Sequence, residues 1–373
     1  MALYPTYFGI DSHANTTTVC AVVMETGEAR TRTFRGNDYG EMRGWMASFP
    51  QPSFGVYESG CTGFVPAREL TGGTALVVPI ATSAIPSSPE SRSKKNDRRD
   101  AERLARLAIS GHYSAVWVPD ADTEGLRDLS QAIADSAERL KGCRQRVEAL
   151  LLKHGLVFAE RTPSGRPVKR WGRRHWEWVE SADLGGEGSN AALAFAVEAA
   201  REAERAHEAL LERARQVLAA SPMAAVADAL QHVKGCGFLT ALAFSAEMGD
   251  FSRFGSGRKV TSYFGLAPRD RSSADDRRSG GASKCGCGLV RRLLTECAWA
   301  HSRARALSAK RGPSGVPAEV AAHAARLSRR LTERRRSMLA RGVHANVANT
   351  ATAAEAARFL WAVGLAAQRA AAA

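Results

Sequence analysis

Lys94-Lys95-Asn96-Asp97-Arg98-Arg99-Asp100-Ala101-Glu102-Arg103-Leu104-Ala105-Arg106-Leu107 is a basic stretch that carries acids in line with apolar residues. Asp97 and Asp100 recur with two leucines at steps of three and four residues, which predicts a helix with both carboxylates on its core-facing side. A divalent cation, held by carboxylates and substrate phosphates, would compensate these acids. Acids are also common as caps and in the first turn of a helix, so this stretch alone leaves both interpretations open.

The residues before this stretch predict an α/β domain with a mixed sheet, because strand-like and helix-like runs alternate along them. Residues 7–11, 16–23 and 29–34 predict a three-stranded meander, and residues 54–58 and 74–80 predict two further strands.

Two of these predicted strands end in an acid, Asp11 and Glu58. Sites in open α/β sheets form at the carboxyl ends of strands, so both acids could meet Asp97 and Asp100 there. Two like charges ~4 Å apart repel by about 4 kcal/mol at an effective dielectric constant of ~20, so four clustered acids would need cations among them. Two-metal sites for phosphoryl transfer have this composition.

The positive charge of the chain is concentrated in one region. The net charge of the 373 residues is +14, and residues 251–345 alone contain 21 Lys/Arg against 6 Asp/Glu. Such a localised excess indicates a polyanionic partner and favours nucleic acid.

The remaining bulk features indicate an intracellular protein. The seven cysteines form no Cys-x-x-Cys pair, so neither a disulfide framework nor a zinc site is predicted. No secretion signal is recognisable, and no apolar run approaches the ~20 residues of a membrane span. We therefore expect a cytoplasmic protein.

The middle of the chain predicts a long helical pair. Residues 124–153 and 191–219 have the apolar spacing of antiparallel helices or a coiled coil. Residues 161–189, between them, combine tryptophan with arginine, and such side chains can stack on nucleic-acid bases. The alternative is a hydrophobic tip that packs on a partner subunit. The residues predicted to contact nucleic acid here are Trp171, Arg173 and Arg174.

A helix-hairpin-helix turn is predicted at Lys234-Gly235-Cys236-Gly237, between helices at 224–233 and 239–248. Its Gly-x-Gly would present backbone N–H groups to a phosphate at a helix N-terminus. The residues predicted to contact nucleic acid in this half are Lys234, Gly235, Gly237, Arg277, Arg278, Lys284, Arg291 and Arg292.

The rest of the C-terminal half is expected to be mainly helical, with helices at 257–264, 289–300, 319–340 and 351–365 and an Ala-rich tail that frays. Between the first two of these helices we expect a basic loop that contains Ser272 and Ser273. Most serines in such a loop are simply solvated, but a serine near a metal site can be a nucleophile on phosphorus.

These residues together resemble the insertion-sequence one-ten family of transposases. The N-terminal matches are Asp11 after YFGI, Glu58 in YESGCTG, and Asp97 with Asp100 in KNDRRDA. The C-terminal matches are KGCGFLTALAFSAEMGDFSRF, YFGLAPRDRSS and SKCGCGLVRRLL. The resemblance extends from residue 7 to about residue 300, and two unrelated sets of motifs agree on it.

The resemblance implies a RuvC-like (ribonuclease H-like) domain at 1–120, a coiled-coil insertion at 121–222, a basic transposase domain at 223–345, and a C-terminal helix and tail at 346–373. It implies a recombinase that is guided by a bridge RNA, pairs with donor and target DNA, and assembles as dimers that join into a tetramer. It also implies that Mg²⁺ is held by Asp11, Glu58, Asp97 and Asp100, and that Ser273 attacks DNA to form a phosphoserine link.

Two features depart from the family pattern. Ala274 follows the serine where the family usually has glycine, and Asp275-Asp276 adds acids to a basic loop. Two alternatives stay open: a RuvC-like nuclease or junction resolvase that uses water, and a non-catalytic nucleic-acid-binding protein whose acids are caps.

Overall fold

The computed structural model describes residues 4–82, 96–270, 279–302 and 312–372. The chain divides into two compact units, Met1–Asp120 and Ala121–Ala373. None of the described helices combines the length and apolar character needed to traverse a bilayer. The second unit contains the segments predicted as three separate domains, and that finer division stays a prediction.

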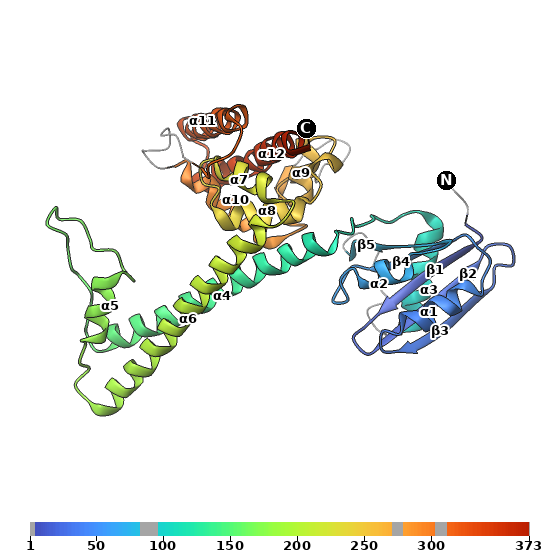
Figure 1. Ribbon diagram of the computed structural model, residues 1–373, viewed down its shortest axis with the longest axis horizontal. Coiled ribbons are helices and arrows are strands. Elements are labelled where there is room, and N and C mark those ends of the chain that lie inside the picture. Colours follow the sequence, from blue (N-terminus) through green and yellow to red (C-terminus); the bar gives the residue numbers. More distant parts are fainter. Residues whose placement is uncertain (1–3, 83–95, 271–278, 303–311, 373) are drawn as a thin grey trace. The chain divides into compact units, whose positions relative to one another are not determined.

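The first unit is built on a five-stranded mixed sheet in the order β3-β2-β1-β4-β5 (Figure 1). The first three strands are antiparallel, and β4 and β5 run parallel to β1. This is the strand order of ribonuclease H-like folds, so the predicted fold class is confirmed. The strands are β1 (Thr6–Ser12), β2 (Thr16–Val23), β3 (Ala29–Arg35), β4 (Ser53–Glu58) and β5 (Ala75–Ile80).

Helices α1 (Tyr39–Ala47), α2 (Val65–Leu70) and α3 (Asp97–Ser110) pack on this sheet. The contact between α3 and β1 is unusually close because β1 has a glycine there. A Cβ atom on Gly9 would lie 1.9 Å from the carbonyl oxygen of Ala101 and 2.3 Å from the backbone nitrogen of Ala105. The backbone of α3 therefore lies directly on the strand that carries Asp11.

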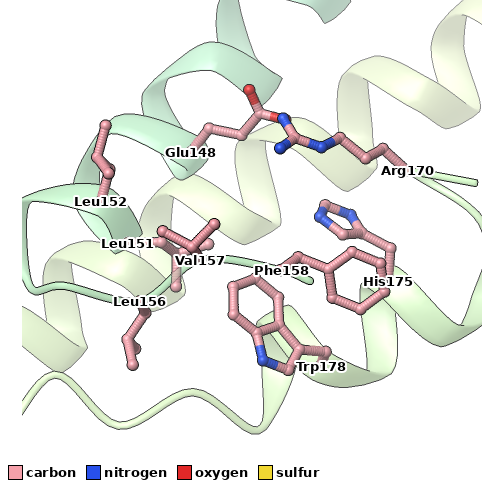
Figure 2. A pocket seen from close by; sticks show the side chains of 9 residues that line it. All are labelled: Glu148, Leu151, Leu152, Leu156, Val157, Phe158, Arg170, His175 and Trp178. Atoms are coloured by element: carbon pink, nitrogen blue, oxygen red, sulfur yellow. The ribbon is translucent and has the colours of Figure 1, made fainter. Parts of the chain in front are cut away.

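The second unit begins with two long helices, α4 (Ala121–Lys153) and α6 (Glu187–Ala219), which pack along each other as an arm (Figure 1). This confirms the predicted helical pair. The short helix α5 (Arg173–Glu180) packs at the tip of the arm, in a segment for which no helix was predicted. A cavity of about 130 Å³ at the tip is lined by Leu151, Phe158 and Trp178 among others (Figure 2).

The rest of the second unit is a helical module around one apolar core. Buried alanines of the last helix, such as Ala353 and Ala357, let it pack closely on four other helices of the module. That helix continues to Ala372, so the expectation of a frayed Ala-rich tail is wrong. The helices are α7 (Ala224–Gln231), α8 (Phe238–Met248), α9 (Gly257–Tyr263), α10 (Gly288–Ala300), α11 (Ala318–Ala340) and α12 (Ala345–Ala372).

A small hairpin replaces part of the loop expected after α9. Strands β6 (Pro268–Asp270) and β7 (Ser279–Ala282) pair antiparallel. β7 was not predicted because Ser-Gly-Gly-Ala contains no β-branched or aromatic residue.

Two arginines cap the C-terminal end of α8. Arg127 of α4 donates to the carbonyl oxygens of Ala246 and Glu247, at 2.9 and 3.0 Å. Arg253 donates to the carbonyl oxygens of Met248 and Glu247, at 2.8 and 3.1 Å. Hydrogen bonds from charged donors contribute about 1.5–3 kcal/mol each to stability. A cation at this end of a helix also interacts favourably with the negative end of the helix dipole. The first turns of the arm are thereby fastened to the helical module.

A buried histidine joins α10 to the predicted hairpin turn. His301 is 1% exposed, with Nδ1 2.8 Å from the hydroxyl of Thr332 and Nε2 3.1 Å from the carbonyl oxygen of Lys234. Neutral imidazole can donate from Nε2 to that carbonyl and accept at Nδ1 from the threonine. Burial lowers the pKa of His301 from 6.5 to about 4, so the folded protein keeps it neutral.

We expect acid to destabilise the second unit through His301. Between pH 6.5 and about 4 the unfolded chain binds this proton and the folded protein does not. The free energy of unfolding should therefore decrease as the pH is lowered through that window, by up to about 1.4 kcal/mol per pH unit. Urea titrations at several pH values should show this slope in wild type and in the exposed-site control His344→Gln, and a shallower slope in His301→Gln. Equal slopes in all three proteins would contradict the assignment.

Candidate active site

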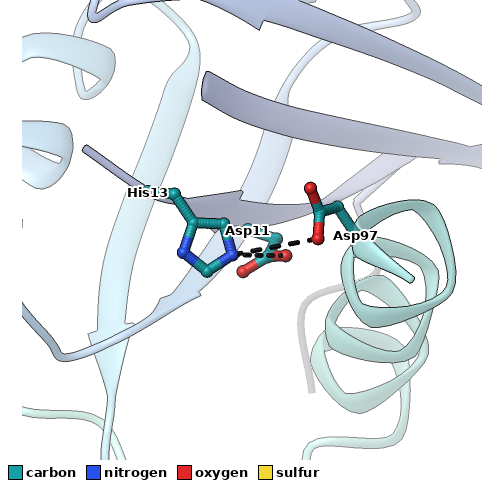
Figure 3. A group of neighbouring side chains, drawn as sticks. All are labelled: Asp11, His13 and Asp97. Atoms are coloured by element: carbon teal, nitrogen blue, oxygen red, sulfur yellow. Dashed lines mark ion pairs between the residues drawn. The ribbon is translucent and has the colours of Figure 1, made fainter. Parts of the chain in front are cut away.

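The centre of the site is a contact between the end of β1 and the start of α3. His13 Nε2 lies 3.3 Å from Asp11 Oδ2 and 4.0 Å from Asp97 Oδ1 (Figure 3). One donor atom from each of the three side chains lies within 4.8 Å of the others. His13 was not predicted as a site residue, although its position two residues after Asp11 at a strand end places both side chains on one side of the chain.

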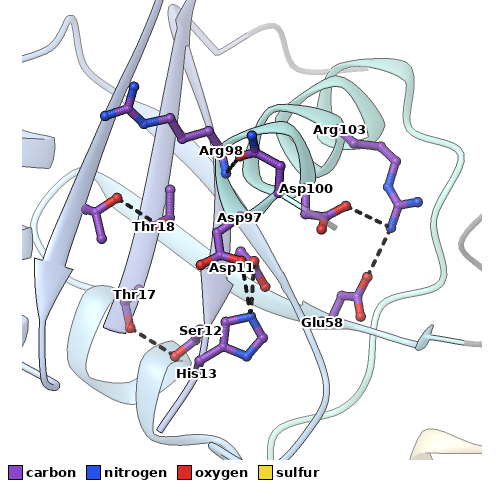
Figure 4. Close-up of polar contacts among 12 residues, drawn as sticks. Asp11, Ser12, His13, Thr17, Thr18, Glu58, Asp97, Arg98, Asp100 and Arg103 are labelled. Atoms are coloured by element: carbon purple, nitrogen blue, oxygen red, sulfur yellow. Dashed lines mark hydrogen bonds and ion pairs between the residues drawn. The ribbon is translucent and has the colours of Figure 1, made fainter. Parts of the chain in front are cut away.

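The other two predicted acids lie beside this group. Glu58 is the last residue of β4, which is parallel to β1, and Asp100 is one turn after Asp97 on α3 (Figure 4). Arg103 of the same helix lies between them, 3.4 Å from Glu58 Oε1 and 4.0 Å from Asp100 Oδ1. The structure therefore brings all four acids to one end of the sheet, as two pairs that each face a basic side chain.

The N-cap of α3 is a residue other than its two acids. Asn96 is the N-cap residue, and its side-chain oxygen accepts a hydrogen bond from the backbone N–H of Arg98. Asp97 and Asp100 lie in the first turn, where a negative charge interacts favourably with the positive end of the helix dipole. Their side chains point toward Asp11 and Glu58 rather than back to the helix end (Figure 4).

The electrostatics of Asp11 indicate a site built for positive charge. Burial raises the pKa of the Asp11 carboxyl above its ordinary value, the nearby His13 lowers it, and the acids Asp97 and Asp100 raise it further. Asp11 Oδ2 and His13 Nε2 are both buried atoms that make no hydrogen bond of good geometry among the described residues. A divalent cation fits this donor set, since it would ligate the same oxygens that now repel one another.

The predicted hairpin turn lies between α7 and α8, and its first glycine has a packing role. Gly235 has φ of +84°, and a Cβ atom there would lie 2.5 Å from the carbonyl oxygen of Cys297. The backbone N–H of Lys234 donates to the hydroxyl of Ser328. Gly237 is exposed at the N-cap of α8 with open space beside it, so a phosphate contact there stays a prediction.

The basic residues after the hairpin differ in their surroundings. Arg291 donates to the carbonyl oxygens of Cys285 and Phe264, so it fixes the segment before α10. Arg292 pairs with Glu138 of α4 at 3.2 Å, and Lys284 is exposed with φ of +60°. Ser273, Arg277 and Arg278 lie outside the described residues.

The tryptophan and arginines of the tip pack among themselves. The ring of Trp171 contacts His175 and Trp176 and lies under the Arg144 guanidinium. Arg174 forms an ion pair with Glu160, and Arg173 lies 3.5 Å from the carboxylate of Glu177. These contacts account for the tip as a small folded core, and its contact with nucleic acid stays a prediction.

Comparisons with known proteins agree with both halves of the chain. A family model described as "Transposase", of the DEDD type of IS110, matches residues 8–155, and one described as "Transposase IS116/IS110/IS902 family" matches residues 227–312.

Individual relatives extend the similarity over most of the chain. It is 35% identical over 310 residues to "Putative transposase y4qE" of Sinorhizobium fredii, across 82% of this chain and 74% of that protein. It is 26% identical over 288 residues to the transposase for insertion sequence element IS1533 of Leptospira borgpetersenii, across 76% and 81%. It is 28% identical over 216 residues to the transposase for IS1111A of Coxiella burnetii, across 55% and 54%. The chain therefore belongs to the IS110/IS116/IS902 family of transposases, which catalyse DNA transposition.

Proposed function

We propose that this transposase is an RNA-guided recombinase that cuts and rejoins donor and target DNA with Ser273 as its nucleophile. The observation that carries the proposal is the meeting of Asp11, Glu58, Asp97 and Asp100 at one end of the sheet. The positive charge of residues 251–345 supports a nucleic-acid substrate. The guide, a bridge RNA that pairs with both DNAs, and assembly of dimers into a tetramer in the cytoplasm are part of the same proposal.

Mg²⁺ is the cation that we propose for the acidic site. Asp11 and Asp97 would hold it together with Glu58 and Asp100, and His13 and Arg103 lie beside these acids. Bound Mg²⁺ supplies positive charge that stabilises the transition state of phosphoryl transfer.

The serine step keeps the number of phosphodiester bonds constant. Ser273 Oγ forms a bond to the scissile phosphorus and loses its proton, while the bond from phosphorus to one sugar oxygen breaks and that oxygen gains a proton. A sugar hydroxyl of the other duplex then attacks the phosphoserine and releases the serine. Attack by water instead would hydrolyse the DNA and end the exchange.

The test is a search for DNA covalently attached to the protein. Purified protein is incubated with Mg²⁺, labelled DNA of the element's ends and RNA transcribed from the DNA that flanks the gene, and products are separated under denaturing conditions. We expect an RNA-dependent protein–DNA adduct that is lost in Ser273→Ala and retained in the neighbouring control Ser272→Ala.

Other outcomes would select a different mechanism. Nicks without an adduct that survive Ser273→Ala would identify the water-using nuclease. An adduct lost only in Ser272→Ala would move the nucleophile by one residue, and an adduct formed equally well without RNA would remove the guide from the proposal.

A further inference from the structure

A large groove lies in the second unit, between α9, the β6–β7 hairpin and α12, with a volume of about 970 Å³. Its lining includes apolar side chains such as Pro268, Val347 and Ala351. Val347 is 59% exposed, so the groove presents apolar surface to its contents. None of the sequence motifs predicted this groove, because its lining residues come from α9, the β6–β7 hairpin, α11 and α12.

The groove has a basic rim. Its lining residues include four basic side chains, Arg258, Lys284, Arg334 and Arg358, and a single acid, Glu355. Arg258, Lys284 and Arg334 are exposed, and the Nε of Arg358 donates to the hydroxyl of Thr261 at 3.0 Å. The rim therefore carries a net positive charge toward solvent.

The acid of the groove holds two arginines in place. Glu355 is 4% exposed, and its two carboxylate oxygens lie 3.3 Å from Nε of Arg330 and 2.9 Å from Nε of Arg334. Of these two arginines, Arg334 lines the groove. Glu355 is thus a positioning residue for the rim.

An apolar floor under a basic rim fits one class of ligand, a nucleic-acid strand with unstacked bases. The bases would lie on the apolar surface and against arginine planes, and the phosphates would lie at the rim. Cavities of about 300–1,000 Å³ hold small molecules, so this groove has room for a few nucleotides at most. A paired duplex presents no free base face to such a floor.

We propose that this groove holds a short unstacked stretch of single-stranded DNA next to the point of cleavage. The choice of DNA rests on the proposed function: β6 and β7 line the groove and lead into residues 271–278, which contain Ser273.

The first test compares matched charge variants of the full chain in EDTA, where no cleavage occurs. Binding of a short fluorescent oligothymidylate is measured by anisotropy at several salt concentrations. The double variant Arg258→Gln/Arg358→Gln should bind about tenfold more weakly, with a salt slope reduced by about 1.4, since each phosphate contact contributes ~0.7 for single strands. The control Lys259→Gln/Arg336→Gln removes two exposed charges outside the groove and should stay within about twofold of wild type.

The second test fills the groove without changing its charge. Ala351→Phe should weaken oligothymidylate binding several-fold and leave binding of a blunt duplex unchanged. Equal losses in the groove and control double variants, or unchanged single-strand binding in Ala351→Phe, would overturn the proposal. Tighter binding of oligouridylate, with the same variant pattern, would overturn the choice of DNA.

These measurements are independent of the proposed chemistry. Ser273→Ala should bind oligothymidylate as wild type does, because the binding assay needs no nucleophile. Groove binding with no covalent adduct would refute the proposed function alone, and an adduct that forms normally in both groove variants would refute the groove alone.

Discussion

Asp11→Asn is expected to lower DNA cleavage and strand transfer by at least about a thousandfold, the size of effect that follows when charge stabilisation of a transition state is removed. Asparagine keeps the shape of the side chain and removes the charge at the centre of the acidic site. The carboxylate lies 3.3 Å from His13 and in one group with Asp97. The rate of adduct formation on labelled DNA measures the loss.

The same variant should not unfold the protein. Burial raises the pKa of Asp11 in the folded state, so the folded protein binds this proton more tightly than the unfolded chain does. Charged Asp11 therefore costs stability at neutral pH, and the cost disappears as the pH falls through the folded-state pKa. Asp11→Asn should melt no lower than wild type in EDTA at pH 7.

Two results would contradict this prediction. An inactive Asp11→Asn that melts well below wild type would show that the aspartate is structural. Retained activity would remove Asp11 from the site, whereas the control Ser12→Ala, whose hydroxyl faces Thr17 instead, should stay active.

Gly9→Ala is expected to destabilise the first unit by about 3 kcal/mol or more, because the added methyl group meets backbone atoms that cannot rotate away. The Cβ atom would lie 1.9 Å from the carbonyl oxygen of Ala101, so α3 must move off the sheet. That movement would carry Asp97 and Asp100 away from Asp11. We therefore expect lost activity together with a lower melting temperature, in contrast to Asp11→Asn.

The same substitution elsewhere provides the control. Gly44 lies on an exposed side of α1, and a Cβ atom there would meet no atom within 4 Å. Gly44→Ala should raise the free energy of unfolding by about 0.5–1 kcal/mol, because alanine favours a helix interior. If both alanine variants melt alike, the close contact between α3 and β1 does not limit stability.

The sheet and its acids were accessible from the sequence because both follow local rules. The sequence shows two strand-like runs that end in Asp11 and Glu58, and a helix that begins at Asp97. These features predict three acids near one end of the sheet. His13 was missed because a lone histidine after a strand carries no pattern of its own. The bridging position of Arg103 also depends on the tertiary fold, since its partner Glu58 lies 45 residues earlier.

The C-terminal half shows the limit more clearly. Its helices were predicted by apolar spacing, but the groove and the β6–β7 hairpin arise from elements that no local pattern connects. Gly235 was predicted as a phosphate contact from its motif, whereas the structure shows that the approach of Cys297 also requires glycine there. A motif therefore identifies the residue and leaves its physical reason to be found in the packing.

The hydrogen bonds from Arg127 to the C-terminal carbonyl groups of α8 restrict how α4 can move. A rotation of α4 relative to α8 would break two charge-assisted hydrogen bonds. Together these bonds contribute about 3–6 kcal/mol of stability. We therefore expect the first turns of α4 to move together with the last turn of α8.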